Sequence, residues 1–311
     1  MDGFINLEKG QTNKSFRLDR MQLLAEKAGH PENKLACIHV AGSKGKGSIT
    51  TMLASILEEA GLIPARYVSP HIIDYRERVG LAFSNFPEHI YVQAGERLRE
   101  ILGIGLEKEL LLPGEEEPTF FELMTLFFFL CAELYPCSTA AIETGMGGRL
   151  DATNIVTPLV SVISPIELEH TEFLGTSIAA IAAEKAGIIK AGRPVVIAEQ
   201  SDAALEVFKA KALEMASPLY ELGEELSIED LHITKEGSSA SLSFKNRDLF
   251  PLPLHPELPL AGEIQVKNAG LALLASRLAF PVITTSSSLG GFLKQSFPRV
   301  LSVYARPPPY L

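Results

Sequence analysis

The chain alternates between short apolar runs and segments in which apolar residues recur every three or four positions. Four runs are nearly continuously apolar, the pattern of strands covered on both faces. They are residues 35–40, 140–142, 159–163 and 194–197. Four segments have helical spacing. They are residues 49–57, 177–186, 203–215 and 265–278. This alternation predicts an α/β fold with a mostly parallel sheet and helices on both faces.

Two other segments depart from the alternation. Residues 119–135 are apolar almost all round, which predicts a helix buried between layers. Their uncharged stretch, residues 123–132, is too short to cross a bilayer, since spanning needs about 20 residues. Residues 231–244, with a Gly/Ser turn at 236–239, predict an antiparallel hairpin on the sheet edge.

The last part of the chain has a different composition. Residues 284–311 include a Ser/Gly-rich stretch and three consecutive prolines at 307–309, which fit neither a helix interior nor a central strand. We therefore expect one ATP-binding domain over residues 1–297 and a linker or stub of a further domain over 298–311.

Composition and charge exclude several classes of protein. A hydrophobic fraction of 46% with 21% charged residues is that of a globular protein. The net charge of −10 gives no basic field for nucleic acid or anionic lipid, so a phosphate ligand needs a local site. The N-terminus lacks the layout of a signal peptide, and the three cysteines form no CxxC pair. We expect a cytoplasmic protein that binds neither nucleic acid nor membrane.

A glycine-rich loop directly follows the first apolar run. It consists of Gly42, Ser43, Lys44, Gly45, Lys46, Gly47 and Ser48. Glycines let the backbone approach a phosphate, the N–H groups of the following helix face the anion, and a lysine neutralises its charge. The loop differs from the common P-loop pattern, because Val40 replaces the first glycine and Gly47 separates Lys46 from Ser48. The sequence predicts ATP binding through a variant loop.

Residues 39–48 closely resemble the loop of the folylpolyglutamate synthase and dihydrofolate synthase family, a branch of the Mur ligases. The family usually has threonine and asparagine in place of Ser43 and Lys44. Further stretches resemble the family in the same order along the chain. They are residues 69–71, 77–79, 119–122, 143–154 and 184–190. The resemblance implies a P-loop α/β domain followed by a second, Rossmann-like domain.

Candidate magnesium ligands come from both the residue pattern and the resemblance. Glu143 follows a predicted strand, so it should lie at the carboxyl edge of the sheet, where open α/β folds bind ligands. On the pattern alone, His170 is better explained as a polar residue satisfied by hydrogen bonds. The resemblance implies that Ser69, Glu143 and His170 bind Mg²⁺.

Lys185 has two interpretations. Near the end of a predicted helix, a lysine is ordinarily solvated and complements the helix dipole. The resemblance instead implies a carbamylated Lys185 that holds a second Mg²⁺, with Lys46 and Lys185 as the catalytic residues. Carbamylation requires a neutral amine, and burial beside other cations lowers the pKa of a lysine.

The resemblance also implies substrate and nucleotide contacts. Residues matching the pterin-side pocket are Arg17, Leu18, Asp19, Thr119, Phe120, Phe121, Glu122, Leu150, Asp151 and Ala152. The phenylalanines could equally be core, and Asp151 could simply cap a turn. Asn268 matches an adenine-contacting asparagine. Arg299 matches a phosphate-binding arginine, although the glycine of that element is missing. Glu169 replaces an aspartate that usually precedes the histidine.

The implied reaction is ATP-dependent ligation of L-glutamate to dihydropteroate, to tetrahydrofolate and its polyglutamates, or to both. It would pass through an acyl phosphate, with Mg²⁺ and Lys46 stabilising the transferred charge. The segment that begins the family's second domain is due where this sequence stops. Three explanations are open: a truncated protein, a second domain supplied by a separate chain, or an incomplete sequence. A nucleotide-binding remnant without activity and, independently, a Mur-type ligase acting on a cell-wall precursor are the alternative functions.

Overall fold

The computed structural model describes residues 17–103 and 117–281. Arg299, the expected domain boundary after residue 297 and the expected linker lie outside the described residues.

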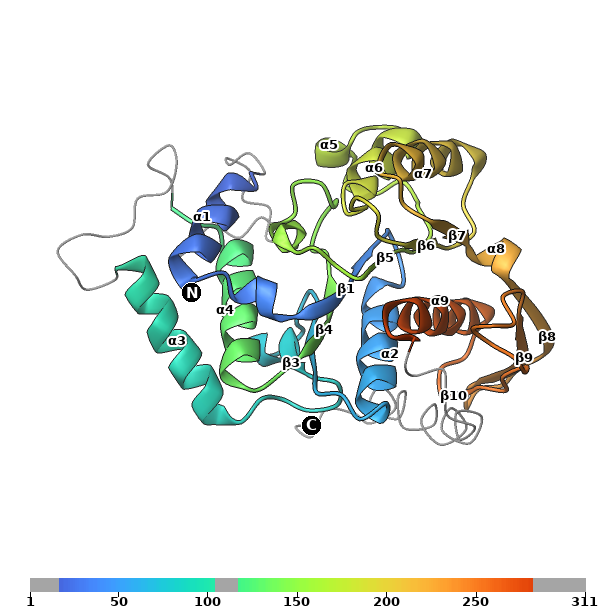
Figure 1. The fold of residues 1–311 in the computed structure, drawn as a ribbon, viewed down its shortest axis with the longest axis horizontal. Coiled ribbons are helices and arrows are strands. Elements are labelled where there is room, and N and C mark those ends of the chain that lie inside the picture. Colours follow the sequence, from blue (N-terminus) through green and yellow to red (C-terminus); the bar gives the residue numbers. More distant parts are fainter. Residues whose placement is uncertain (1–16, 104–116, 282–311) are drawn as a thin grey trace.

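A seven-stranded sheet in the order β3-β2-β4-β1-β5-β6-β7 forms the centre of the molecule (Figure 1). Its strands are β1 (Ala36–Ala41), β2 (Pro64–Tyr67), β3 (Val79–Leu81), β4 (Thr139–Glu143), β5 (Val160–Ile163), β6 (Val195–Ile197) and β7 (Leu219–Glu221). Neighbours run parallel except β2 and β3. The central strand β1 pairs with β4 and β5, with His39 opposite Ile142 and Ser161. The carboxyl ends of three central strands therefore meet at one edge.

Helices cover both faces of this sheet, as the alternation predicts (Figure 1). Helices α2 (Lys46–Glu59) and α9 (Glu263–Ala279) pack on one face. The other face carries α1 (Asp19–Ala28), α3 (Glu88–Leu102), α4 (Phe120–Leu134), α6 (Ile178–Ala186) and α7 (Asp202–Glu214). Two single-turn helices, α5 (Thr171–Leu174) and α8 (Leu222–Glu225), lie in connections.

The side chains of β1 divide the apolar core into three clusters. Ile38 and Val40 pack with α2 and α9. Cys37 points to the opposite face and packs with α4, whereas Ala41, further along the same face, packs with α6 and α7. Because successive residues of a strand face opposite sides, a single strand anchors all three clusters. The loop that leaves β1 therefore starts where the clusters meet.

Helix α4 is the buried helix that the apolar run at 119–135 predicts. Twelve of its fifteen residues are buried, and it lies between the sheet and α3. Thr119 caps its first turn: Thr119 Oγ1 accepts from the Glu122 amide at 3.2 Å, and Glu122 Oε2 accepts from the Thr119 amide at 2.7 Å. This reciprocal cap fixes where the helix begins.

The predicted hairpin forms, but its predicted place is wrong. Strands β8 (Leu226–Ile233) and β9 (Ser238–Phe244) pair antiparallel and join β10 (Glu257–Leu258) in a separate three-stranded sheet. Leu242 and Phe244 of β9 belong to the core cluster of α9. The hairpin therefore folds over α9 instead of extending the main sheet. The antiparallel edge of the main sheet is β3.

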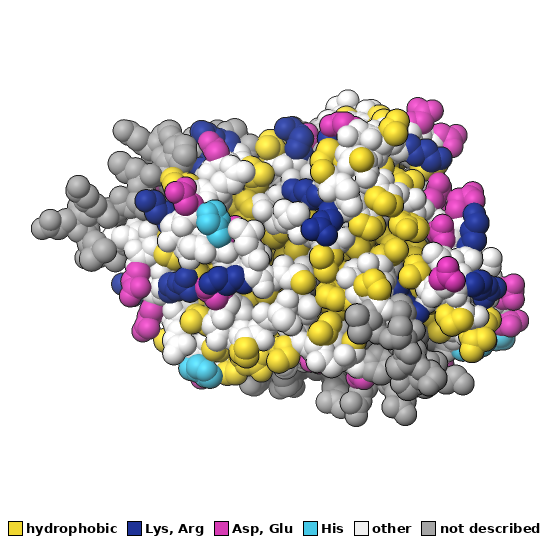
Figure 2. Space-filling view, viewed as in Figure 1, with side chains coloured by type: hydrophobic (Ala, Val, Ile, Leu, Met, Phe, Trp, Pro, Cys, Tyr) yellow, Lys and Arg dark blue, Asp and Glu magenta, His cyan; other side chains and the backbone are white. Residues whose placement is uncertain are grey.

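In the two described ranges, no helix combines the length and apolar character needed to cross a bilayer. On the face shown in Figure 2, basic and acidic side chains are interspersed with apolar ones, and a few basic side chains gather near its middle. Any attraction for an anion on this face is therefore local, as the net charge of −10 predicts.

Candidate active site

The loop from Gly42 to Ser48 joins β1 to α2, as predicted. Gly42 has φ +139°, and a β-carbon there would lie 1.8 Å from Ser164 Oγ, so only glycine fits. Gly45 occupies the N-cap of α2 with φ +84° and supplies no side-chain cap. The first N–H groups of a 14-residue helix are thus left for a ligand. This is the arrangement of an anion site.

The side chains of the loop differ in their surroundings. Lys46 Nζ turns back over the loop and donates to the carbonyl oxygen of Gly42 at 3.1 Å. Ser43 Oγ donates to the Glu167 carbonyl at 3.2 Å and accepts from its amide at 3.0 Å, which ties the loop to the segment after β5. Lys44 is exposed and forms an ion pair with the Glu167 carboxylate. Lys46, not Lys44, is therefore the cation placed for phosphate.

Glu143 lies at the carboxyl end of β4, next to the loop. Its carboxylate is buried beside Gly47 and accepts from the Ser69 amide at 3.1 Å. Burial raises the pKa of Glu143 to about 7, although Lys46 and the Ser69 amide favour the charged form. A cation bound beside it would favour ionisation and relieve this penalty. The structure thus brings two of the expected magnesium ligands together.

Lys185 and His170 flank the same loop from its other side. Lys185, in the last turn of α6, is 1% exposed and donates to the Gly42 carbonyl at 2.8 Å and to Glu169 Oε1 at 2.6 Å. Burial lowers the pKa of Lys185; Glu169 opposes this shift, and Lys46 adds to it. His170 is exposed and directly precedes α5. Within the described ranges, no three His, Cys, Asp or Glu side chains gather as a metal site.

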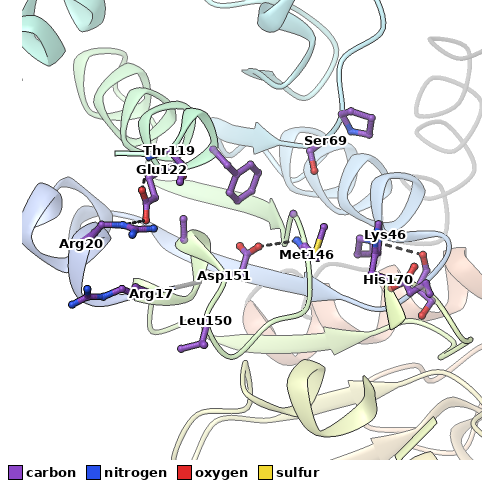
Figure 3. Close-up of a pocket in the computed structure, with 16 residues that line it drawn as sticks. Arg17, Arg20, Lys46, Ser69, Thr119, Glu122, Met146, Leu150, Asp151 and His170 are labelled. Carbon is purple, nitrogen blue, oxygen red and sulfur yellow. Dashed lines mark hydrogen bonds and ion pairs between the residues drawn. The ribbon is translucent and has the colours of Figure 1, made fainter. Parts of the chain in front are cut away.

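A cavity of about 420 Å³ extends from this loop towards α1 and α4 (Figure 3). Figure 3 shows Lys46 and His170 at one end, Arg17, Arg20 and Glu122 at the other, and Asp151 and Met146 between them. Its lining residues are Arg17, Arg20, Ser43, Lys46, Ser69, Pro70, Thr119, Phe121, Glu122, Gly145, Met146, Leu150, Asp151, Ala152, Glu169 and His170. One cavity therefore joins the phosphate loop to the predicted pterin-side residues.

The end of the cavity away from the phosphate loop is built by α1 and α4. Arg20 Nε donates to Glu122 Oε1 at 3.0 Å, and both side chains are buried. Thr119 and Phe121 also line the cavity, as predicted. Three predicted residues do not line it. Phe120 packs in the core under Arg78, Leu18 is the N-cap of α1, and Asp19 is exposed and pairs with Arg17.

The segment between β4 and β5 supplies one side of the cavity through Leu150, Asp151 and Ala152. Asp151 is buried, and its carboxylate accepts from the amides of Met146 at 2.9 Å and Thr153 at 3.0 Å. It therefore caps a turn, as one interpretation predicts, and it also lines the cavity. Burial raises the pKa of Asp151, although the donors around it favour the charged form.

Asn268 lies on α9 behind the phosphate loop and does not line the cavity. It is 1% exposed, and its amide is the nearest group to a β-carbon placed on Gly45, at 2.9 Å. Its Nδ2 donates to Gln265 Oε1 at 3.3 Å. Its Oδ1 finds no partner among the described residues and can accept from a ligand.

Five lining residues, Arg20, Pro70, Gly145, Met146 and Glu169, are not among those that the sequence assigns to the site. Arg20 carried a detectable signal, because Arg20, Leu24 and Ala28 share one face of α1 at helical spacing and all three are buried. Met146 and Pro70 lie inside stretches that resemble the family. Glu169 adjoins His170 and stands out only through its contact with Lys185.

The fold and the sequence are both similar to known ligases. Residues 40–276 match the Mur ligase middle domain. The chain is 34% identical to the dihydrofolate synthase/folylpolyglutamate synthase of Bacillus subtilis (strain 168), over 94% of this chain and 68% of that protein. It is 31% identical to the folylpolyglutamate synthase of Lacticaseibacillus casei, over 83% of this chain and 59% of the relative. The chain therefore spans about three fifths to two thirds of these relatives.

The fold is also similar to solved structures of folylpolyglutamate synthases. A folylpolyglutamate synthase bound to AMPPCP and folate superposes with a TM-score of 0.80 at 27% identity, covering 95% of this chain and 70% of the other. The phosphate loop, the buried Glu143 and the cavity thus occur in a chain whose fold and sequence match one group of enzymes. The chain belongs to the folylpolyglutamate synthase and dihydrofolate synthase family of Mur-type ligases.

Proposed function

We propose that this chain carries the nucleotide site and the pterin-side site of an ATP-dependent ligase, which joins L-glutamate to dihydropteroate, to reduced folates, or to both. The observation that carries the proposal is the single cavity lined by Lys46 and Ser43 at one end and by Arg17, Arg20 and Phe121 at the other. A substrate with an aromatic head and a carboxylate tail fits such a cavity, because Phe121 offers a ring face and the loop offers positive charge.

Each residue near the loop has a separate role in the proposed reaction. The α2 amides and Lys46 hold the triphosphate and stabilise the charge that develops as the γ-phosphoryl group moves to the substrate carboxylate. ADP leaves with the bridging oxygen, and an acyl phosphate remains on the substrate. The glutamate amine then attacks the acyl carbon, releasing inorganic phosphate and a proton as the amide forms. Asn268 Oδ1, buried and free to accept, would hold the nucleotide base.

Magnesium fits the donors near the loop. Glu143 with Ser69, and His170 from the opposite side, would hold one ion, which neutralises phosphate charge when bound. The burial of Glu143, which raises the pKa of its carboxyl group, supports this assignment, because a bound cation would compensate the charge of the ionised form. Carbamylation of Lys185 is part of the proposal and would supply carboxylate oxygens for a second ion. Its support is the burial that lowers the pKa of Lys185, and mass spectrometry of the intact protein in bicarbonate buffer tests it.

ADP release that depends on both glutamate and a pterin substrate tests the function. We expect release with dihydropteroate or tetrahydrofolate when ATP, Mg²⁺ and L-glutamate are present. The assay is run on this chain and on the chain extended by the second domain of the Bacillus subtilis relative, because the relatives are longer. If neither protein releases ADP with any folate but turnover occurs with a nucleotide-sugar precursor, the substrate assignment is wrong.

A cytoplasmic location completes the proposal. All three cysteines, Cys37, Cys131 and Cys137, are free thiols, and two of them are buried. Free thiols suit a reducing compartment.

A further inference from the structure

A polar contact interrupts the apolar core on the sheet face that carries α4 and α6. His39, in the middle of β1, lies between Cys37 of one core cluster and Ala41 of the other. Its imidazole is fully buried and meets Thr153, which is also fully buried. Thr153 follows the segment 145–152, which lines one side of the cavity. The centre of the sheet is thus in polar contact with the wall of the active site.

The hydrogen bonds in this contact have a defined direction. His39 Nε2 lies 2.8 Å from Thr153 Oγ1. A hydroxyl has a single proton, and Thr153 donates it to Asp151 Oδ1. The hydroxyl must therefore accept from His39, so the proton of the neutral imidazole is on Nε2.

The other imidazole nitrogen leads to the same assignment. Nδ1 of His39 is buried and has no partner among the described residues. A protonated Nδ1 would be a buried donor without an acceptor, which is rarer and more costly than a bare lone pair. Both nitrogens therefore select the neutral tautomer with Nε2–H.

The chain of hydrogen bonds ends on a carboxylate that closes the cavity wall. Besides the Thr153 hydroxyl, Asp151 accepts from the amides of Met146 and Thr153. The carboxylate thus connects the two ends of residues 146–153, and Met146, Leu150 and Asp151 between them line the cavity. A rotation of the Asp151 side chain would release Met146 and change the shape of this wall.

We propose that His39 is a positioning residue for the pterin-side site, acting through Thr153 to hold the Asp151 carboxylate and the cavity wall in place. The identity of the ligand rests on the proposed function, whereas the direction of the hydrogen bonds does not. His39 is fully buried and does not line the cavity. An apolar side chain of similar size would fill the core equally well at this position. What His39 adds is one N–H donor.

Two matched pairs of variants distinguish the positioning role of His39 from a role in filling the core. His39→Gln keeps an N–H donor at position 39, whereas His39→Leu does not. Thr153→Ser keeps the hydroxyl, whereas Thr153→Val keeps the shape and loses it. We expect His39→Leu and Thr153→Val to weaken binding of dihydropteroate by about tenfold, the worth of one buried hydrogen bond. The Gln and Ser variants should stay within about threefold of the parent. Affinity for AMPPCP should be unchanged in all four.

Nitrogen NMR of the whole chain labelled in histidine gives a readout that does not depend on any ligand. We expect a neutral His39 with its proton on Nε2, and loss of that proton's coupling to the Thr153 side chain in Thr153→Val. A proton on Nδ1 would overturn the inference, and so would equal losses of dihydropteroate affinity in His39→Leu and His39→Gln. If the parent binds AMPPCP but no folate, the proposed ligand is wrong. The position of the His39 proton still tests the proposed hydrogen bond to Thr153, because that measurement needs no ligand.

Discussion

Four buried ionisable side chains around the cavity have shifted pKa values, and in each the neutral form is favoured by burial. Burial raises the pKa of Glu143 and Asp151 and lowers that of Lys185 and His39. Ion pairing and amide donors oppose the shift at three of them, but at His39 the nearby cation Lys190 adds to it. Burying the charged form of Glu143 or Lys185 costs free energy. A bound ligand that compensates that charge removes this cost, which favours binding.

Lys46 and Lys44 make a matched pair for testing the phosphate loop. Lys46→Met removes the cation that lies over the loop, and we expect AMPPCP affinity to fall about 10- to 100-fold, the worth of a charge-assisted hydrogen bond. Lys44→Met removes an exposed cation paired with Glu167, so affinity and stability should hardly change. Titration calorimetry of both variants measures this. Equal losses in the two variants would contradict the assignment of Lys46.

The buried His39 should make the free energy of unfolding fall as the pH is lowered. Burial lowers the pKa of His39 from 6.5 to about 3, so the folded chain keeps it neutral while the unfolded chain takes up a proton below pH 6.5. Its contribution to stability is full above pH 6.5 and is lost as the pH falls towards 3. At pH 5 the loss is about 2 kcal/mol.

Urea unfolding of the parent and of His39→Gln between pH 8 and pH 5 measures this contribution. The stability of the Gln variant should fall less steeply below pH 6.5, because it has no imidazole to protonate in the unfolded state. Parallel curves for the two proteins would show that His39 does not titrate on unfolding. Asp151, which contacts Thr153 and has a raised pKa, is present in both proteins and so cancels in the comparison.

At the scale of elements, the buried ion pair between Arg20 and Glu122 joins α1 to α4. Arg20→Met leaves the Glu122 carboxylate buried without its partner, and we expect a loss of about 3–5 kcal/mol in the free energy of unfolding. Arg17→Met is the control, since Arg17 is about a third exposed and forms an ion pair with Asp19, two residues along the chain; its cost should be below about 1 kcal/mol. Urea denaturation compares them, and similar costs would mean that the buried pair does not anchor α1.

The elements that the sequence predicts are those whose signal is local. Helix α6 begins after Ser177, whose hydroxyl accepts from the Ala180 amide, and the apolar spacing of residues 177–186 predicts it almost to the residue. The sequence does not predict β2, whose four residues include a proline and an arginine, a weak strand signal. The position of the hairpin depends on the packing of β9 against α9, which no local pattern encodes.

The same distinction holds within the site. Glu143 and the phosphate loop are predictable, because each directly follows a central strand and parallel strands end at one edge. The contacts of Arg20 with Glu122 and of His39 with Thr153 join residues 102 and 114 positions apart. Such pairs follow from the order of strands in the sheet, and the sequence patterns do not specify that order.

At the scale of the whole molecule, the site lies where three core clusters meet. The phosphate loop leads into α2 of the first cluster, the opposite end of the cavity rests on α4 of the second, and Lys185 belongs to α6, which packs in the third. The hydrogen bond from Lys185 to the Gly42 carbonyl ties α6 to the loop that leads into α2. A ligand that occupies the cavity therefore touches elements of all three, and it should stabilise them together.

This arrangement predicts one cooperative thermal transition that nucleotide shifts as a unit. AMPPCP with Mg²⁺ at 100 times its dissociation constant stabilises the native state by about 2.7 kcal/mol, which corresponds to a rise in Tm of roughly 5 °C for a chain of this size. Calorimetry should show a single peak that moves without splitting, and Lys46→Met should remove about half of the shift or more at the same nucleotide concentration. A split peak of which only one part responds would show that the clusters unfold independently, because a ligand stabilises only the unit that binds it.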